Sequence, residues 1–367
     1  MSQARRPRAL VRLNEKATIP VSFFVESNTH FQADTFRVNL EAWNQRDGFG
    51  MNYWADAENV MVEILIGFLL PGQDEAAIPD NLTSLLIGQV DDVDVDPTTG
   101  ELMISGRDLT GKLIDTKTSN MWPSQTASEI VTRLATEAGL TPKVTKTTTP
   151  VGNYTNGFYS ALGREVPLWD LITSMAQREG FDAYVTGTTL YFGPIEADND
   201  KNPYEISCFK DAATGRINSS VERLSLRRSL TLAKDITVTV LSHSVYYGTP
   251  IKAVAKRQGS AKSGRTSFRS GQTSQNYVIR RPNMTQDQAN KLAQKTLADL
   301  SRYERTFHAQ TYDDGLLTTK RRVRISGTGS SWDQAYYIDK LTREFEFGEL
   351  TMQISGKNHP VESQPNV

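Results

Sequence analysis

The sequence predicts a mainly β protein with α/β insertions, an α+β fold. Segments before residue 115 and after residue 205 alternate apolar and polar residues or are continuously apolar, as β-strands are. Between them a helix–glycine–strand unit occurs twice, at residues 128–144 and, 41 residues later, at 169–185. Two copies are too few for a solenoid, so the repeat predicts a small duplicated α/β module inside a larger chain.

The composition excludes several classes of protein. The chain has 367 residues, 38% hydrophobic and 23% charged, which is ordinary for a folded protein of several domains. Its net charge of −1 excludes a strong overall attraction to nucleic acid. A single cysteine, Cys208, and four histidines exclude an internal disulfide and a Cys/His zinc cluster. We find no signal sequence and no membrane span, and expect a soluble protein that is not exported.

The N-terminal segment is predicted to be mostly strand. Residues 35–43 alternate strictly, which is typical of a half-buried strand. Residues 60–70 are almost continuously apolar, which indicates a strand covered on both faces. Residues 85–95 and 101–105 flank a turn that contains proline and glycine, so they predict a hairpin.

The duplicated module has recognisable helix ends. Thr126 and Glu129 form a capping box at the start of the first helix, and Pro167 is expected at the first helical position of the second. Gly139 and Gly180 follow the two helices, where we expect a left-handed backbone conformation. A short hairpin is predicted at residues 186–188.

After residue 205 strands return, interrupted by a loop and a helix. Residues 256–276 lack apolar periodicity and are predicted to be an exposed loop, and a helix with a one-sided apolar stripe begins near Thr285. Strands are predicted at residues 221–230, 236–241, 308–312, 322–327, 336–347 and 350–355. The predicted domains are a first β domain at 1–115, the α/β module at 116–204, a second β domain at 205–255 and 306–357, a basic loop with a helix at 256–305, and a tail at 358–367.

Signals for a metal site are weak. The aspartates at positions 91, 92, 94 and 96 suggest a calcium loop, but Pro97 and Met103 occupy positions where an EF-hand needs glycine and glutamate. Three of these aspartates alternate with Val93 and Val95, as on a strand with one exposed face. We therefore predict no metal site.

Signals for catalysis are equally weak. No nucleophile–base set is present, and Glu165, Asp170 and Glu179 do not have the arrangement of a glycosidase carboxylate pair. We predict a protein that is not an enzyme and has no cofactor.

A long segment without acidic residues lies between Asp235 and Asp287. It is either a solvated loop or a contact for the acidic surface of a partner, with DNA in a lumen as a further possibility. Phe268 and Tyr277 are too few for a base-stacking platform, so a protein partner is favoured over nucleic acid. The candidate partner-binding residues are Lys252, Lys256, Arg257, Lys262, Arg265, Arg269, Arg280 and Arg281.

The order of these elements resembles the phage late-control protein D family, the baseplate hub proteins of contractile tails, which are related to the hub part of VgrG-type spikes. Four segments carry the resemblance together, through their order and spacing. Within them we expect Gly106, Asp108 and Trp332, like Gly139 and Gly180, to have structural roles. The segments are SGRDLTGKLID at 105–115, LWDLI at 168–172 with GF at 180–181 and LYFG at 190–193, DITVTV at 235–240, and GTGSSWDQAYYI at 327–338.

The resemblance implies a structural protein of a phage tail baseplate. It implies a homotrimeric ring in which each subunit contributes two β-barrel domains similar to the tail-tube fold, with the α/β module as a peripheral insertion. Such a ring would join the tail tube to the central spike and line the channel for genome ejection. No spike-like segment precedes the end at Val367, so we expect the spike to be a separate chain. Expected partners are the subunit itself, the tube protein, the spike, other baseplate proteins and, transiently, DNA; the location is the virion, after tail assembly in the host cytoplasm.

Two further considerations concern assembly. Residues 60–70 and 236–241 supply more strand surface than one small domain needs, so we expect neighbours to cover strand edges in a trimer. The alternative function is a glycan- or cell-wall-binding module, because short β–α–β units occur in such proteins. That alternative depends on exposed aromatic residues, which cluster here only at Tyr154, Phe158 and Tyr159.

Overall fold

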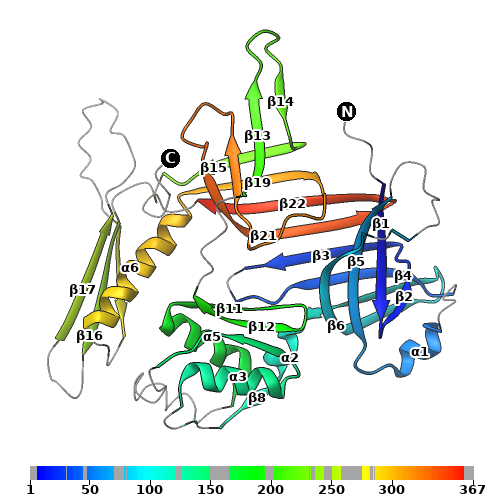
Figure 1. Cartoon of the computed structure of the whole chain (residues 1–367), viewed down its shortest axis with the longest axis horizontal. Helices are drawn as coiled ribbons and strands as arrows, with labels where there is room; N and C mark the ends of the chain where they lie inside the picture. The colour runs from blue at the N-terminus through cyan, green and yellow to red at the C-terminus, as the bar shows by residue number, and fades with distance from the viewer. Residues whose placement is uncertain are drawn as a thin grey trace.

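The chain folds into a mainly β protein, as predicted, with one large mixed sheet, three small sheets and few helices (Figure 1). No helix among the described residues is long and apolar enough to cross a membrane. The computed structural model describes residues 6–29, 31–43, 48–69, 78–79, 81–120, 122, 125–148, 165–194, 202–230, 232, 236–243, 250–257, 275–281, 284 and 286–358.

The large sheet has fourteen strands. They are β1 (Arg6–Leu13), β2 (Lys16–Thr18), β3 (Ser22–Asn28), β4 (Thr35–Glu41), β5 (Met61–Leu69), β6 (Thr83–Asp96), β7 (Glu101–Asp108), β13 (Tyr204–Lys210), β14 (Ile217–Ser219), β15 (Arg223–Arg228), β19 (Arg305–Tyr312), β20 (Val323–Ser326), β21 (Ala335–Glu346) and β22 (Glu349–Asn358). The order is β14-β13-β20-β21-β3-β4-β7-β6-β5-β1-β2, with β22, β19 and β15 added in turn beside β21. The alternation predicted for residues 35–43 is confirmed in β4, where buried and exposed residues alternate.

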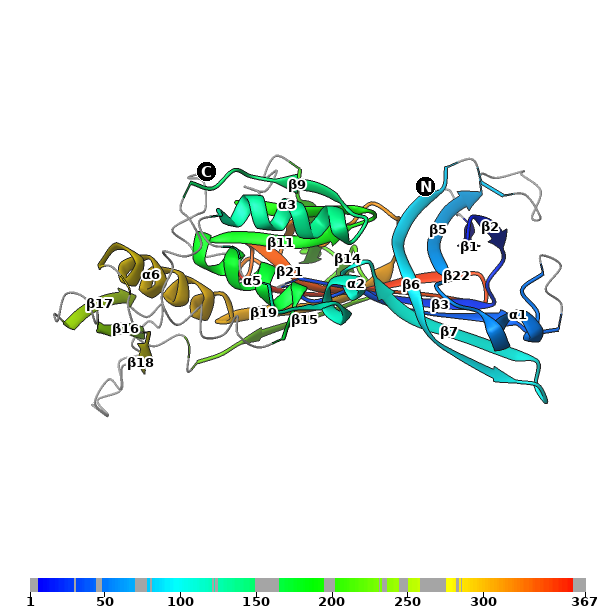
Figure 2. The same cartoon turned by 90° about the horizontal axis from the view of Figure 1, so that it is seen from below.

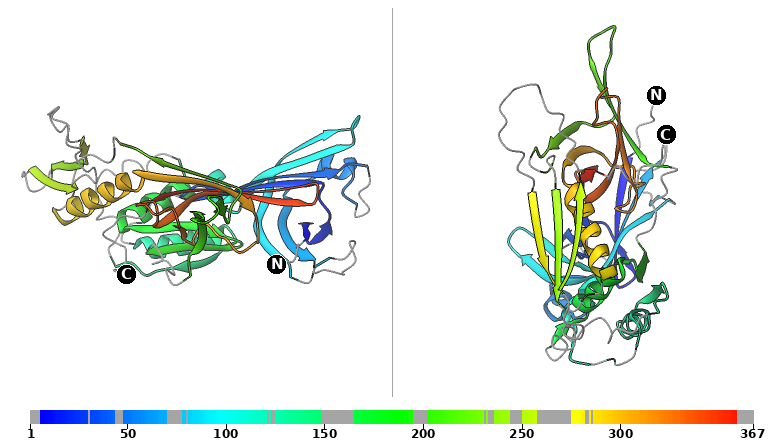
Figure 3. Two further views of the ribbon diagram at one scale, coloured as in Figure 1. Left: turned by 90° about the horizontal axis from the view of Figure 1, so that it is seen from above. Right: turned by 90° about the vertical axis from the view of Figure 1, so that its left-hand side faces the viewer.

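The two predicted β domains are halves of this one sheet. β3 of the N-terminal half pairs with β21 of the C-terminal half, with Phe23 opposite Phe345, and the sheet runs without a break through both (Figure 3, left). The expectation of two β-barrel domains is therefore corrected, because no barrel closes within the described residues. β21 pairs with β3 as well as with β20 and β22, so its edges bridge the halves and are not available to close either one.

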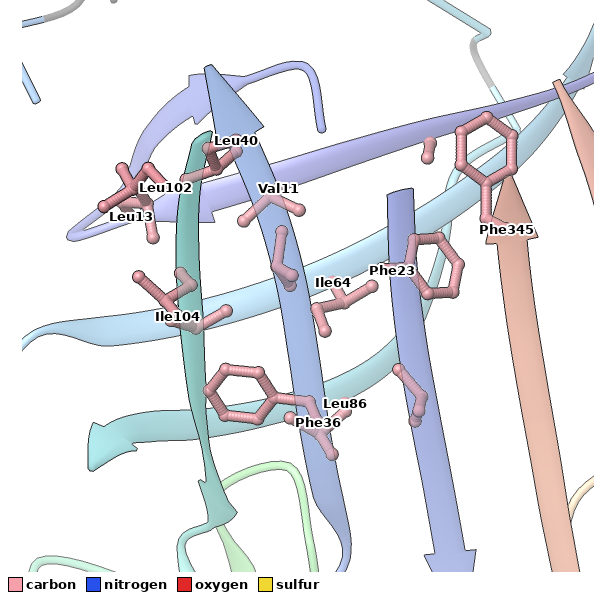
Figure 4. Close-up of a cluster of buried hydrophobic side chains, with 14 of the residues drawn as sticks. Val11, Leu13, Phe23, Phe36, Leu40, Ile64, Leu86, Leu102, Ile104 and Phe345 are labelled. Atoms are coloured by element: carbon pink, nitrogen blue, oxygen red, sulfur yellow. The ribbon is translucent and has the colours of Figure 1, made fainter. Parts of the chain in front are cut away.

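Each half has its own hydrophobic core on the same face of the sheet. In the N-terminal half, β1 and β5 curl over β3, β4 and β7, so that Val11 and Ile64 face Ile104 (Figure 4). In the C-terminal half, Phe307 and Tyr336 are fully buried and contact edge to face. Burial of such large apolar side chains is the main source of stability for both halves.

The α/β module packs against the N-terminal half, and its predicted helix ends are confirmed except at Pro167. Thr126 and Glu129 form the capping box, and Gly139 and Gly180 both have φ of +74°. Pro167 is the residue before the second helix rather than its first helical residue, because it is paired with Lys117 in a short extended strand. The helices are α2 (Thr110–Asp115), α3 (Ala127–Glu137) and α5 (Leu168–Glu179), and the strands are β8 (Lys117–Thr118), β9 (Thr141–Val144), β10 (Val166–Pro167), β11 (Phe181–Thr186) and β12 (Thr189–Pro194).

A third unit is a small sheet covered on one face by a helix (Figure 3, right). Its strands β16 (Ile236–His243), β17 (Pro250–Arg257) and β18 (Gln275–Arg280) pack on α6 (Gln286–Arg302). The assignment of the segment that forms β16 and β17 to the second β domain is therefore corrected. Val238 and Val240 are buried against Ala289 and Ala293 of the predicted apolar stripe, so these strands bury their apolar face without the large sheet.

The strands expected to offer edges to a neighbour are interior strands. β5 lies between β1 and β6, and β16 lies between β17 and β18. The edges available for assembly must therefore come from other strands. Two helices that the sequence did not predict lie in the N-terminal segment: α2, and α1 (Met51–Asp56), which buries Trp54 in the N-terminal core.

Candidate assembly surfaces

The segment 105–115 forms the junction between the N-terminal half and the α/β module. Gly106 lies opposite a β-bulge in β6, and a Cβ atom at this position would lie 2.0 Å from the carbonyl oxygen of Gln89, so only glycine fits. Arg107 donates to Asp91 at 2.6 Å and to Asp115 at 2.7 Å. This bridge fastens β6 and α2 to β7, and it assigns Asp91 a structural role.

Asp108 is buried at the start of α2. Its carboxylate accepts hydrogen bonds from the amide nitrogen of Thr110 at 3.1 Å and from the hydroxyl of the same residue at 3.0 Å. Burial, together with the nearby carboxylate of Asp34, raises the pKa of Asp108 to about 7. Burial raises the pKa of Asp34 to about 6. The structural roles expected for Gly106 and Asp108 thus have a direct physical basis in this junction.

Trp332 lies in the turn between β20 and β21. Its carbonyl oxygen accepts a hydrogen bond from the hydroxyl of Tyr336 at 3.1 Å, and the guanidinium of Arg305 lies 5.7 Å from its ring centre. Asp333 accepts hydrogen bonds from the amides of Thr328 and Gly329 in the same turn. These contacts stabilise the turn between β20 and β21.

The face of the large sheet opposite its cores is exposed and acidic near the β21–β22 turn. The strand register places one row of residues from Glu349 to Asp94 across β22, β21, β3, β4, β7 and β6, and the next row from Glu344 to Asp92. Arg37 is the only positively charged residue in these two rows. We call this surface the acidic face; its exposed carboxylates are those of Glu41, Asp92, Asp94, Asp96, Glu101, Glu344, Glu346 and Glu349.

Three of the candidate partner-binding cations lie on one exposed face. Lys252 and Arg280 flank Leu241 in one row of the small sheet, and Lys256 lies on the same face of β17. Exposed Val254 and Val278 lie between them, 44% and 57% accessible. We call this surface the basic face; α6 covers the opposite side. Arg281 follows β18 at an exposed position, and Lys262, Arg265 and Arg269 lie outside the described residues.

Arg257 has a structural role instead. It donates to Glu304 at 2.7 Å, and Arg228 of β15 donates to the other carboxylate oxygen of Glu304 at 3.1 Å. Glu304 is only 2% exposed. The two arginines therefore neutralise a buried carboxylate and tie the third unit to the large sheet, so Arg257 does not belong to the basic face.

A cleft of about 1050 Å³ lies between the α/β module, α6 and the large sheet. Two of its lysines have partners. The Nζ of Lys320 lies 3.4 Å from the ring centre of Tyr184 and 3.4 Å from Asp182, and Lys357 donates to Asp339 at 2.8 Å. Lys320 thereby ties the α/β module to the connection between β19 and β20 of the large sheet across the cleft.

The other chemical candidates do not converge. Asp170 and Glu179 lie at opposite ends of α5, and Glu165 precedes β10. Among the described residues no three histidine, cysteine, aspartate or glutamate side chains are placed to hold a metal ion. The aromatic cluster expected for glycan binding, Tyr154 to Tyr159, lies outside the described residues.

The sequence matches no protein-family model and no curated protein. Its fold, however, is similar over nearly the full chain to that of solved phage tail proteins. The tail protein from Neisseria meningitidis MC58 is 17% identical with a TM-score of 0.66, covering 96% of this chain and 97% of that one. The 43 kDa tail protein of prophage MuSo2 from Shewanella oneidensis is 14% identical with a TM-score of 0.62, covering 96% and 97%. Prophage tail protein gp18 from Listeria monocytogenes EGD-e is 12% identical with a TM-score of 0.55, covering 96% and 95%.

Proposed function

We propose that this chain is a structural subunit of the baseplate of a phage or phage-derived tail, and that three copies form a ring that joins the tail tube to the central spike. The fold shared with tail proteins supports the general role. In this proposal each half of the large sheet takes the place of one tube-like domain, so three subunits present six such halves. The α/β module and the third unit lie outside the channel wall.

The observation that carries the proposal is the acidic face. A double-stranded DNA carries one negative charge per ~1.7 Å of its length, so a wall of the same sign does not retain it. Across the rows from Glu349 to Asp94 and from Glu344 to Asp92, carboxylates outnumber the single guanidinium of Arg37. A broad smooth sheet with this charge suits the inner wall of a channel through which a genome must slide.

The proposal is tested first by the mass of the purified protein at micromolar concentration. Native mass spectrometry and light scattering are expected to give three times the subunit mass of 40.9 kDa. Electron microscopy of the same sample is expected to show a ring with a central channel. A protein that stays monomeric at all concentrations would contradict the ring.

The channel role is tested separately by reversing the charge of the acidic face. The variant Glu344→Lys/Glu346→Lys/Glu349→Lys is expected to retain duplex DNA at low salt, whereas the unmodified ring does not. The matched control replaces the same residues by glutamine, which removes charge without adding cations. Equal DNA retention by the unmodified ring and the lysine variant would contradict a repulsive channel wall.

A further inference from the structure

Part of β6 has no strand on its outer side. Pairing of β6 with β5 ends at Gln89, and the amide of Val90 donates to the carbonyl oxygen of Val60 at 2.9 Å. After the bulge at this point, residues 91–96 pair with β7 and with no other strand of the described chain. This part of β6 is the outer strand beside β7, which pairs on its other side with β4 (Figure 2). We call residues 91–96 the β6 edge.

Charged and apolar residues alternate along the β6 edge. Asp92, Asp94 and Asp96 are exposed on the acidic face, and neither Asp92 nor Asp94 has an ion-pair partner among the described residues. Val93 and Val95 point to the other face, where Val93 is 38% accessible. A strand whose outer edge has no hydrogen-bonded neighbour, and which exposes apolar residues, is a site to which another strand can add.

A second free edge lies at the opposite end of the sheet. β15 pairs with β19 and with no other strand of the described chain. Arg223, Ser225 and Arg227 are exposed on the same sheet face as the acidic face, because Arg223 is opposite Gln310, which is in turn opposite Gln353. Leu224 and Leu226 pack on the C-terminal core. We call residues 223–228 the β15 edge.

We propose that the β6 edge of one subunit pairs with the β15 edge of a second copy of this chain and continues the large sheet from subunit to subunit. This inference rests on the proposed ring and names the strands that join it. The β6 edge reads Asp-Val-Asp-Val-Asp at 92–96 and the β15 edge reads Arg-Leu-Ser-Leu-Arg at 223–227. A register centred on Asp94 and Ser225 brings acid beside base and apolar beside apolar, whether the strands run parallel or antiparallel.

The occupant is a second copy for two reasons. Within one chain the two edges are separated by β7, β4, β3, β21, β22 and β19, so they belong to opposite ends of an open sheet. The charges are also complementary only between the two different edges. Two β6 edges would oppose aspartates to one another, and two β15 edges would oppose arginines, both of which are unfavourable across paired strands.

Cysteine cross-linking tests the register. In a Cys208→Ser background, which removes the only native thiol, the double variant Asp94→Cys/Ser225→Cys is expected to form covalent multimers under mild oxidation, ending in a closed ring. The matched controls are the two single variants, which can link only identical positions. Equal linkage in a single variant and the double variant, or no linkage in an oligomer of confirmed mass, overturns the proposed pairing.

Charge exchange provides a second test that does not depend on cysteine geometry. Asp92→Arg/Asp96→Arg and Arg223→Asp/Arg227→Asp are each expected to weaken self-association at least tenfold at low salt, and their combination in one chain is expected to restore it. Failure of the combined variant to recover when circular dichroism shows it folded contradicts the pairing.

These tests separate the pairing from the ring. A trimer without Asp94–Ser225 linkage refutes the pairing and leaves the proposed function standing. Specific linkage in an oligomer of another size supports the pairing and refutes the threefold ring.

Discussion

Arg343 and Asp313 form a buried ion pair at the boundary between the two cores of the large sheet. The Nε of Arg343 donates to a carboxylate oxygen of Asp313, and the two residues are 4% and 5% exposed. On the same face of β21, Leu341 belongs to the C-terminal core and Phe345 to the N-terminal core. Arg343 also donates to the carbonyl oxygen of Leu317, so it fastens the connection after β19 over the place where the two halves meet.

Breaking this ion pair is expected to destabilise the subunit strongly. Arg343→Met leaves Asp313 buried without its counter-ion, which costs about 3–5 kcal/mol of unfolding free energy. The double variant Arg343→Met/Asp313→Leu removes both charges and is expected to lose less. Urea denaturation at neutral pH measures both. The control is Arg37→Met, an exposed arginine of the same sheet, and a loss at Arg343 no larger than at Arg37 would show that the pair is not important for stability.

Gly180 is expected to tolerate asparagine better than valine. Its φ of +74° is strained for any residue with a Cβ atom, although no atom lies within 4 Å of the Cβ position. The cost of substitution therefore comes from backbone strain alone. Gly180→Val is expected to cost at least about 1 kcal/mol, and Gly180→Asn less, because asparagine adopts this conformation more readily. Thermal denaturation of the two variants gives the ranking, and equal losses would contradict this origin.

The junction at Asp108 is expected to make stability depend on pH. The folded state raises the pKa of Asp34 to about 6 and that of Asp108 to about 7, whereas unfolded aspartate has a pKa of about 4. Between these values the folded chain binds more protons than the unfolded chain, so stability falls as pH rises from about 4 to about 7. Above this range the cost of the buried charge is fully present.

Asp108→Asn tests this pH dependence because it keeps an oxygen acceptor for Thr110 but cannot ionise. At pH 8 the variant is expected to be more stable than the native chain by roughly 1–2 kcal/mol, with a flatter profile below pH 7. Near pH 4 the difference is expected to vanish. Denaturation midpoints across the range measure it, and an unchanged slope in the variant would refute the role of this carboxyl group.

The basic face is expected to serve attachment rather than folding. Lys252→Gln/Lys256→Gln/Arg280→Gln changes exposed charges and is expected to alter unfolding free energy by less than about 0.5 kcal/mol. Attachment to an acidic partner is expected to slow and to lose part of its salt dependence. Tail assembly at low and moderate salt measures this effect, and normal rates in both would mean that the face is only solvated.

Arg257→Gln is the contrasting variant for the basic face. It removes one of the two arginines paired with buried Glu304, and we expect a loss of about 1–3 kcal/mol of unfolding free energy. The structure thus places Arg257 among the residues that support the fold rather than on the surface predicted to bind a partner. A loss as small as that of the triple variant would contradict the structural role of this ion pair.

The sequence predicted the elements that depend on local pattern. The capping box at Thr126, the alternation of β4 and the left-handed glycines are set by neighbouring residues, so they were readable without tertiary contacts. The placement of β16 and β17 was not readable, because a strand pattern does not specify the sheet that a strand joins. The structural roles of Arg257 and Arg343 could not be predicted either, because each depends on a partner from another part of the chain. Their partners, Glu304 and Asp313, are distant in sequence.

Part of the acidic face could be predicted from the sequence. Asp92, Asp94 and Asp96 recur at every second residue, as do Glu344 and Glu346, which is how one face of a strand becomes charged. The sequence could assign the aspartates to an exposed strand face, but joining the two groups into one surface required the register that runs through β21, β3, β4 and β7. Of the cations predicted to bind a partner, the structure places Lys252, Lys256 and Arg280 together on the basic face.

The aspartates of the β6 edge have a second expected effect, which is to oppose aggregation of the isolated chain. Val93 and Val95 on an unpaired strand would otherwise template the addition of any extended chain, including those of unfolded proteins. Charged residues at alternate positions act as gatekeepers against this misassociation. We therefore expect these charges to limit aggregation of the free chain. Replacing these aspartates by neutral residues is therefore expected to increase aggregation of the isolated chain even where its fold is unchanged.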